Sequence, residues 1–158
     1  MSLNFFCDAR KFVYSTVVFL RIEDKSNVQV HLIQSKARIA PCGKKEATIA
    51  RLKLLGAIIA ARLPIEIVKQ FQTDEVHFWT DSTTVLAWLK REDTWGLFVE
   101  NRVQEIRKWT PVKAWRHLPG SMNPADYYQV ELALLNNLAI RNGGRVPAGY
   151  IFPTRNGL

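Results

Sequence analysis

Three of the aspartates stand where a fold could bring their carboxylates together. Asp8 and Asp81 each follow a run of strand-forming residues, and Asp126 lies in the first turn of a predicted helix. In α/β proteins the carboxyl ends of the strands line the functional cleft. Each acid alone is typical of a turn or a helix cap, so a functional interpretation depends on the three meeting.

Carboxylates that converge repel one another unless a cation neutralises them. Hard oxygen ligands with room for a phosphate favour Mg²⁺ or Mn²⁺. Metal-assisted phosphodiester hydrolysis suits such a cluster, because one ion helps to generate hydroxide while a second stabilises the leaving oxygen. Asp8, Asp81 and Asp126 are therefore candidate catalytic residues and candidate metal ligands.

The first forty residues predict a three-stranded antiparallel meander. Residues 3–8, 12–23 and 28–39 are rich in strand formers, and the polar link 24–27 suits a hairpin. A long helix is expected from about Lys45 to Pro64, where the proline should end or kink it. The expected inward stripe of this helix is Ile49, Leu52, Leu55, Gly56, Ile59 and Leu63.

The second half alternates strands and helices. A strand at 76–80 precedes a helix at 83–90 with Ser82 as N-cap, and a helix at 98–109 should turn Val99, Val103 and Ile106 inward. A fifth strand is expected at 112–118, and Asn123 should start a last helix that ends near Ile140. Because the long helix is a crossover, strands 3–8 and 76–80 should be parallel neighbours, so Asp8 and Asp81 should meet.

The predicted architecture is α/β, with a five-stranded mixed sheet flanked by helices in one domain over residues 1–141. Residues 142–158 are expected to be an extended or disordered tail. The formal net charge of +8 and the pI of about 9.8 favour a polyanionic partner, with nucleic acid first. Candidate nucleic-acid contacts are Ser82, Arg91, Arg102, Lys113 and Arg116, although such charges are also typical of a solvated face.

Other residue types narrow the possible functions. Cys7 and Cys42 are too few for a zinc site and are expected to be reduced thiols. The five tryptophans are expected to pack in the core and between helices, and His117 is either a surface residue or a helper in proton transfer or product release. With neither a membrane span nor a secretion signal in evidence, the expectation is an intracellular protein, cytoplasmic or nuclear, without a membrane partner.

Several short motifs are informative when they are taken together. They are FCDA at 6–9, SKARIAP at 35–41, TIARLKLL at 48–55, FWTDST at 78–83, NRVQEI at 101–106 and HLPG at 117–120 before NPAD at 123–126. Together they resemble the ribonuclease H-like domain of BEL/Pao-type retrotransposon polyproteins, over roughly residues 4–126. It implies a ribonuclease H-like fold, an RNA–DNA hybrid as substrate, and four acids that hold two Mg²⁺ or Mn²⁺ ions. It also implies reverse transcriptase and integrase regions of the same polyprotein as partners.

One of the four implied acids is missing. Asp8, Asp81 and Asp126 match three of them, but Lys53 stands where the family pattern has glutamate. At ~4 Å and an effective dielectric of about 20, a unit charge pair is worth roughly 4 kcal/mol, so an ammonium there could displace a cation. Glu46 lies two helical turns from Lys53, which is too far for it to replace the missing glutamate. The sequence after Asp126 also departs from the family pattern.

Three readings remain open from the sequence. The favoured one is a nucleic-acid-binding domain whose catalysis is weakened or lost, with Lys53 paired to Asp8 or Asp81 in place of a metal. The first alternative is an active Mg²⁺-dependent endonuclease that uses Asp8, Asp81 and Asp126. The second is a structural or partner-binding domain without catalysis.

Overall fold

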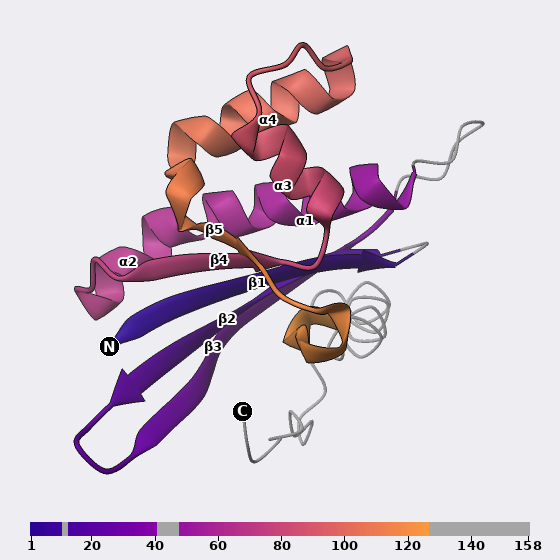
Figure 1. Ribbon diagram of the computed structural model, residues 1–158. Coiled ribbons are helices and arrows are strands. Elements are labelled where there is room, and N and C mark those ends of the chain that lie inside the picture. Colours follow the sequence, from indigo (N-terminus) through magenta and orange to yellow (C-terminus); the bar gives the residue numbers. More distant parts are fainter. Residues whose placement is uncertain (11–12, 41–47, 127–158) are drawn as a thin grey trace, which may run out of the picture.

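Five strands form one mixed sheet in the computed structural model, which describes residues 1–10, 13–40 and 48–126 (Figure 1). The strands are β1 Ser2–Arg10, β2 Val13–Glu23, β3 Val28–Ile39, β4 Val76–Thr80 and β5 Trp115–His117. Their order is β3-β2-β1-β4-β5, with β1, β2 and β3 antiparallel and with β1, β4 and β5 parallel. The predicted meander, the mixed sheet and the parallel pairing of β1 with β4 are confirmed.

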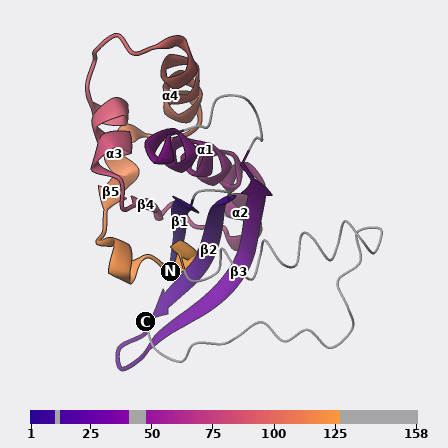
Figure 2. The same ribbon diagram turned by 90° about the vertical axis from the view of Figure 1, so that its right-hand side faces the viewer.

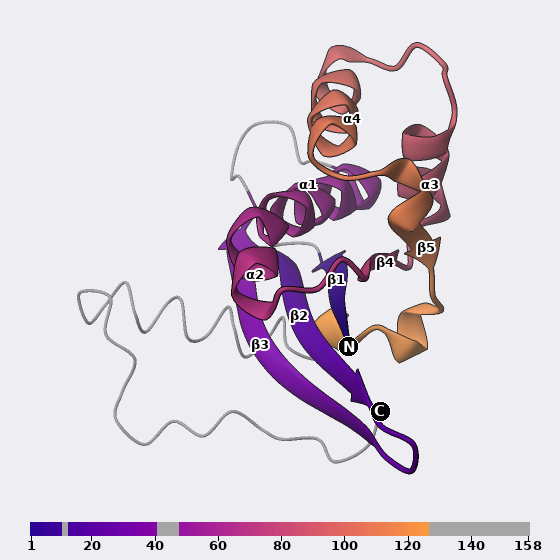
Figure 3. The same cartoon turned by 90° about the vertical axis from the view of Figure 1, so that its left-hand side faces the viewer.

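Four helices and two short 3₁₀ turns accompany the sheet in the described residues. The helices are α1 Ile49–Arg62, α2 Pro64–Phe71, α3 Thr83–Lys90 and α4 Leu97–Trp109, and the turns are η1 Val112–Ala114 and η2 Gly120–Met122. Helices α1, α3 and α4 lie on the same side of the sheet (Figures 2 and 3). The predicted N-cap is confirmed, because the Ser82 hydroxyl accepts the Val85 N–H at 3.1 Å.

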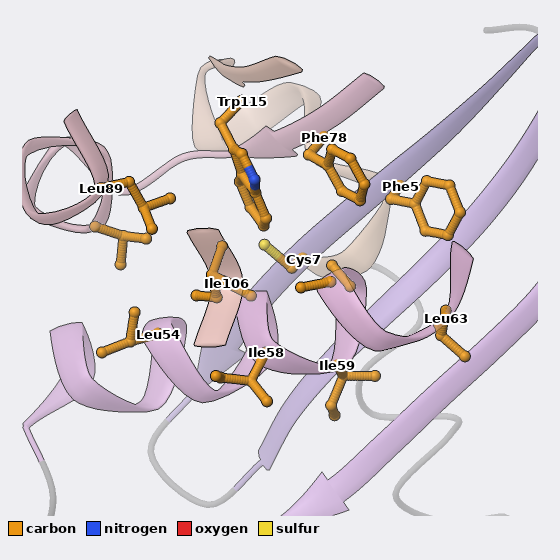
Figure 4. Close-up of a cluster of buried hydrophobic side chains, with 14 of the residues drawn as sticks. Phe5, Cys7, Leu54, Ile58, Ile59, Leu63, Phe78, Leu89, Ile106 and Trp115 are labelled. Carbon is orange, nitrogen blue, oxygen red and sulfur yellow. The ribbon is translucent and has the colours of Figure 1, made fainter. Parts of the chain in front are cut away.

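The core lies between α1 and the central strands (Figure 4). Phe5, Phe78 and Trp115 are cross-strand neighbours on β1, β4 and β5, and their rings stack with centroids 5.1 and 4.9 Å apart. The Trp115 indole N–H donates to the Thr110 hydroxyl at 2.8 Å, so this fully buried ring leaves no unpaired donor. Val99, Val103 and Ile106 of α4 are buried as predicted.

The long helix differs from its prediction in two ways. It begins at Ile49, because the Thr48 hydroxyl caps it by accepting the Arg51 N–H at 3.3 Å. The predicted start at Lys45 falls outside the described residues. Ile49 is 49% exposed rather than inward, whereas the buried positions include Leu54 and Ile58. The cause is that α1 contacts both the sheet and α4, so it buries more than one stripe.

Local backbone chemistry adds one helix and shortens one predicted strand. The predicted end of the long helix near Pro64 is confirmed, because α1 ends at Arg62. Pro64 itself occupies the first turn of a separate helix, α2, where its missing N–H costs nothing, and this helix was not predicted. The predicted strand 112–118 shortens to β5, because the Ala114 N–H bonds to the Pro111 carbonyl and closes η1.

Some predictions fall on residues outside the described part of the chain. Residues 124–126 are helical, but the rest of the predicted last helix and the predicted tail at 142–158 lie beyond them. Cys42 and Glu46 also lie outside the described residues. Across the described segments, no helix combines the length and the apolar character that crossing a membrane requires.

Gly56 allows α1 to approach the sheet. A Cβ atom there would lie 3.0 Å from the Asp8 carbonyl oxygen and 3.3 Å from that of Ser15, both backbone atoms. We expect Gly56→Ala to lower the free energy of unfolding by about 1–3 kcal/mol, as overpacking does. Urea unfolding would measure the loss. Gly96→Ala is the control, because a Cβ at Gly96 meets nothing within 4 Å, and an equal loss in both variants would contradict the close-approach explanation.

Candidate functional site

The parallel pairing of β1 with β4 positions the first two acids. Cys7 lies opposite Thr80 in this register, so Asp8 and Asp81 follow at the same end of adjacent strands. The Ala9 N–H donates to Asp8 Oδ1 at 2.8 Å and fixes that carboxylate. Asp8 is only 4% exposed. The structure therefore brings these two predicted site residues together.

Lys53 reaches this acid pair from α1. Its Nζ donates to Asp81 Oδ1 at 2.8 Å and lies 3.4 Å from Asp8 Oδ1. The side chains of Lys53, Asp8 and Asp81 are 20%, 5% and 10% exposed, so the group is largely shielded from water. The structure therefore shows the Lys53 side chain pointing into the site, and not along the flank of α1.

The electrostatics of the group follow from burial and close charges. Burial, and next the charge of Asp81, raise the pKa of Asp8 to about 6. Burial opposes the charged form of Lys53, but its hydrogen bond to Asp81 and the charges of both acids raise its pKa. The adjacent Cys7 thiol has its pKa raised by burial and then by Asp8, so it is not a nucleophile at neutral pH.

The raised pKa of Asp8 makes stability depend on pH. Between about pH 4 and pH 6 the folded state binds a proton that the unfolded state has released, so stability falls as the pH rises through this window. We expect Asp8→Asn, which cannot ionise, to gain on the order of 2–3 kcal/mol relative to wild type between pH 4 and pH 7. Urea unfolding at both pH values tests this. A difference that does not vary with pH would contradict the assignment to Asp8.

The third acid is held beside the pair but has its own cation. Nε and Nη2 of Arg10 both lie 2.8 Å from Asp126 Oδ1, and the Asp126 side chain is 42% exposed. Asn123 anchors the start of this helical turn, since its amide donates to the Cys7 carbonyl at 3.0 Å and its Oδ1 accepts the Ala125 N–H. The charge of Asp126 also contributes to the raised pKa of Asp8.

These residues do not fit the two divalent ions that the family resemblance implies. The Lys53 ammonium contacts both Asp8 and Asp81, and the Arg10 guanidinium contacts Asp126. Within residues 1–10, 13–40 and 48–126, no three His, Cys, Asp or Glu side chains are grouped as a metal would require. The carboxylates that would bind the metal ions are therefore paired with cationic side chains of the protein itself. For this reason we derive no metal-dependent reaction step for this site.

The remaining predicted site residues lie in different settings. Arg91, Lys113, Arg116 and His117 are exposed. Arg102 is less available, because its guanidinium lies 3.9 Å from the Phe98 ring centroid and donates to the Phe98 carbonyl. The buried Ser82 hydroxyl is used in capping α3. Their roles toward nucleic acid stay predictions.

Arg10 was not among the predicted site residues. It lies two residues after Asp8 on β1, and side chains two apart on a strand share a face. That alternation could have placed it near the acids, but its contact with Asp126 depends on the turn at Asn123, whose position the sequence does not give. Gly120 was also missed, since a Cβ there would lie 3.1 Å from Asp81 Oδ2.

Comparisons with known proteins identify the family of this fold. Residues 1–82 match the family model described as the Pao retrotransposon-like RNaseH-like domain. A comparison with curated proteins finds no match.

Solved structures show the same fold at low sequence identity. The N-terminal RNase H domain of a Mycobacterium tuberculosis protein aligns with a TM-score of 0.58 at 14% identity, covering 90% of this chain and 98% of that one. RNase H1 from Halobacterium salinarum aligns at 0.51 and 17%, covering 84% and 96%. LC11-RNase H1, solved in complex with an RNA/DNA hybrid, aligns at 0.53 and 15%, covering 82% and 94%.

Proposed function

Because the chain belongs to the family of Pao retrotransposon-like RNaseH-like domains, we propose that it binds nucleic acid, an RNA–DNA hybrid in the first instance, with cleavage weakened or lost. The observation that carries the proposal is the 2.8 Å contact between Lys53 Nζ and Asp81 Oδ1. An ammonium fixed between two carboxylates neutralises the charge that would attract divalent ions. In this proposal Lys53 serves as a built-in counter-cation.

Exposed cations outside the acid group support nucleic acid as the partner. Asp8, Asp81 and Lys53 together carry one net negative charge when all are ionised, so they do not themselves attract phosphate. Three exposed cations, Arg91, Lys113 and Arg116, are the groups that would hold the backbone. The similar fold of an RNase H1 solved with an RNA/DNA hybrid supports the choice of duplex.

Salt dependence tests the binding half of the proposal. A protein that neutralises phosphates loses affinity linearly in log[salt], by roughly 0.7–0.9 per phosphate contacted. We expect Arg116→Gln to weaken binding to a blunt RNA–DNA hybrid and to reduce this slope by about 1. Fluorescence anisotropy across a salt series would measure it, with Lys25→Gln at the β2–β3 turn as a charge-matched control. A slope near zero for wild type would reject nucleic-acid binding and favour a protein partner.

A further inference from the structure

A groove lies on the sheet face opposite α1, outside the acid group. Its volume is about 280 Å³. Phe6, Phe19 and Trp79 line it from β1, β2 and β4, and Leu118 and Met122 line it from the segment that leads to Asp126. Met122 is 62% exposed. Apolar surface of this kind, gathered in one place, marks an interaction site.

The aromatic rings in the groove are ordered. The Phe6 and Trp79 rings are nearly parallel, at 13° with centroids 6.2 Å apart, and Phe19 meets the Phe6 ring edge-on at 78°. The Trp79 indole N–H donates to Asn4 Oδ1 at 3.1 Å, which fixes the ring plane. Neither Phe6 nor Trp79 is fully buried. A pre-ordered ring pair of this kind is a stacking surface for a flat partner.

The charges around the groove select the chemistry of that partner. Among the described residues, Arg21 is the only charged one that lines it, and it pairs with Glu23 at 2.6 Å. The Arg116 guanidinium lies 6.0 Å from the Trp79 ring centroid. An extended peptide could not add a strand here, because β1 is paired on both sides, with β2 and β4. Rings beside arginine, with no carboxylate among the described lining residues, fit an aromatic group on an anionic chain, which is a nucleobase.

The groove adjoins the acid group through one short segment. Gly120 of that segment packs against the Asp81 carboxylate, while Leu118 and Met122 face the groove. The Leu118 N–H donates to the Thr80 carbonyl at 3.1 Å, and this bond ties the segment to β4. A strand that leaves a duplex held near Asp81 would therefore meet the groove next.

We propose that this groove holds an unpaired base of the bound nucleic acid, stacked on Trp79, with Arg116 at its phosphate. The proposal goes beyond the proposed duplex binding, because it adds a site for single-stranded nucleic acid. It also changes the interpretation of Trp79, which sequence alone places among the packing residues. Trp115, in contrast, is a core residue as expected.

Fluorescence anisotropy with the full chain tests the groove. The probes are a blunt RNA–DNA hybrid, the same hybrid with a short single-stranded overhang, and that overhang with abasic nucleotides. Base stacking on an aromatic ring is worth roughly 1–3 kcal/mol, so the overhang should tighten wild-type binding about tenfold and its abasic form should not. Trp79→Leu should lose the gain and keep the affinity for the blunt hybrid.

The control variant is Trp109→Leu, which removes a tryptophan that is 46% exposed on α4, and it should keep the gain. A gain that survives both Trp79→Leu and abasic substitution would overturn the proposal and leave the groove to a protein segment. The abasic arm decides the matter in wild type even if Trp79→Leu does not fold. The groove can also be tested without a duplex, by measuring the affinity of the chain for a normal single strand and for an abasic one. If the chain does not bind the blunt hybrid, only the proposed duplex function is therefore rejected.

Discussion

Replacing Lys53 by methionine should lower the free energy of unfolding at neutral pH by about 3–5 kcal/mol, as removal of one partner from a buried ion pair does. The change keeps the apolar stem but removes the only ammonium that contacts both Asp8 and Asp81 in the described structure. Two nearly buried carboxylates would then face each other without a counter-charge. Urea unfolding of the purified chain at pH 7 measures the loss.

Two companions make this result specific to the acid pair. Lys69→Met removes an exposed lysine from α2 and should change stability little. The double variant Lys53→Met with Asp8→Asn should recover most of the loss, because one carboxylate is gone. The deficit should also shrink at acid pH, because Lys53 lowers the pKa of Asp8 and its removal lets Asp8 take up a proton more readily. The counter-cation role would be contradicted if Lys69→Met lowered the free energy of unfolding as much as Lys53→Met does. It would also be contradicted if neither Asp8→Asn nor acid pH reduced the loss in Lys53→Met.

Replacing Lys53 by glutamate should make stability depend on a divalent metal. The substitution changes the local charge by two units beside Asp8 and Asp81, so without metal the variant should be less stable than wild type. With Mg²⁺ or Mn²⁺ at 100 times its dissociation constant, the gain should be about 2.7 kcal/mol. Thermal unfolding with and without metal measures it, and wild type should show no comparable shift.

Lys53→Gln is the matched control for metal binding. It removes the same ammonium but adds no ligand charge, so it should respond to metal less than Lys53→Glu does. Arg10→Gln in the Lys53→Glu background tests whether the Asp126 pairing competes as well, because that guanidinium contacts the third acid. A metal-dependent shift in wild type equal to that of Lys53→Glu would show that the ammonium does not exclude the ion.

The sequence predicts the sheet and the meeting of two acids because both depend on local patterns. The strand-forming runs before Asp8 and Asp81 and the helical crossover between them are enough to imply a parallel pair with its acids at one edge. The cap at Ser82 is equally local. Long-range contacts are what the sequence leaves open.

The orientation of Lys53 and the pairing of Arg10 are such contacts. A helical wheel places Lys53 at the margin of the buried face, where it could lie along the flank or turn inward. The structure shows it turned inward, with its Nζ 2.8 Å from Asp81 Oδ1. Arg10 meets Asp126 across 116 positions of the chain. The separate helix α2 was missed because Pro64 was interpreted only as the end or a kink of the long helix, and not also as the first residue of another.

Cleavage of a labelled RNA–DNA hybrid in Mg²⁺, by wild type beside Lys53→Glu, tests the central claim most directly. With the Lys53 ammonium between Asp8 and Asp81, wild type should leave the RNA strand intact or cut it slowly, and Lys53→Glu should raise the rate. Wild-type cutting at a rate that Lys53→Glu does not raise would contradict the account.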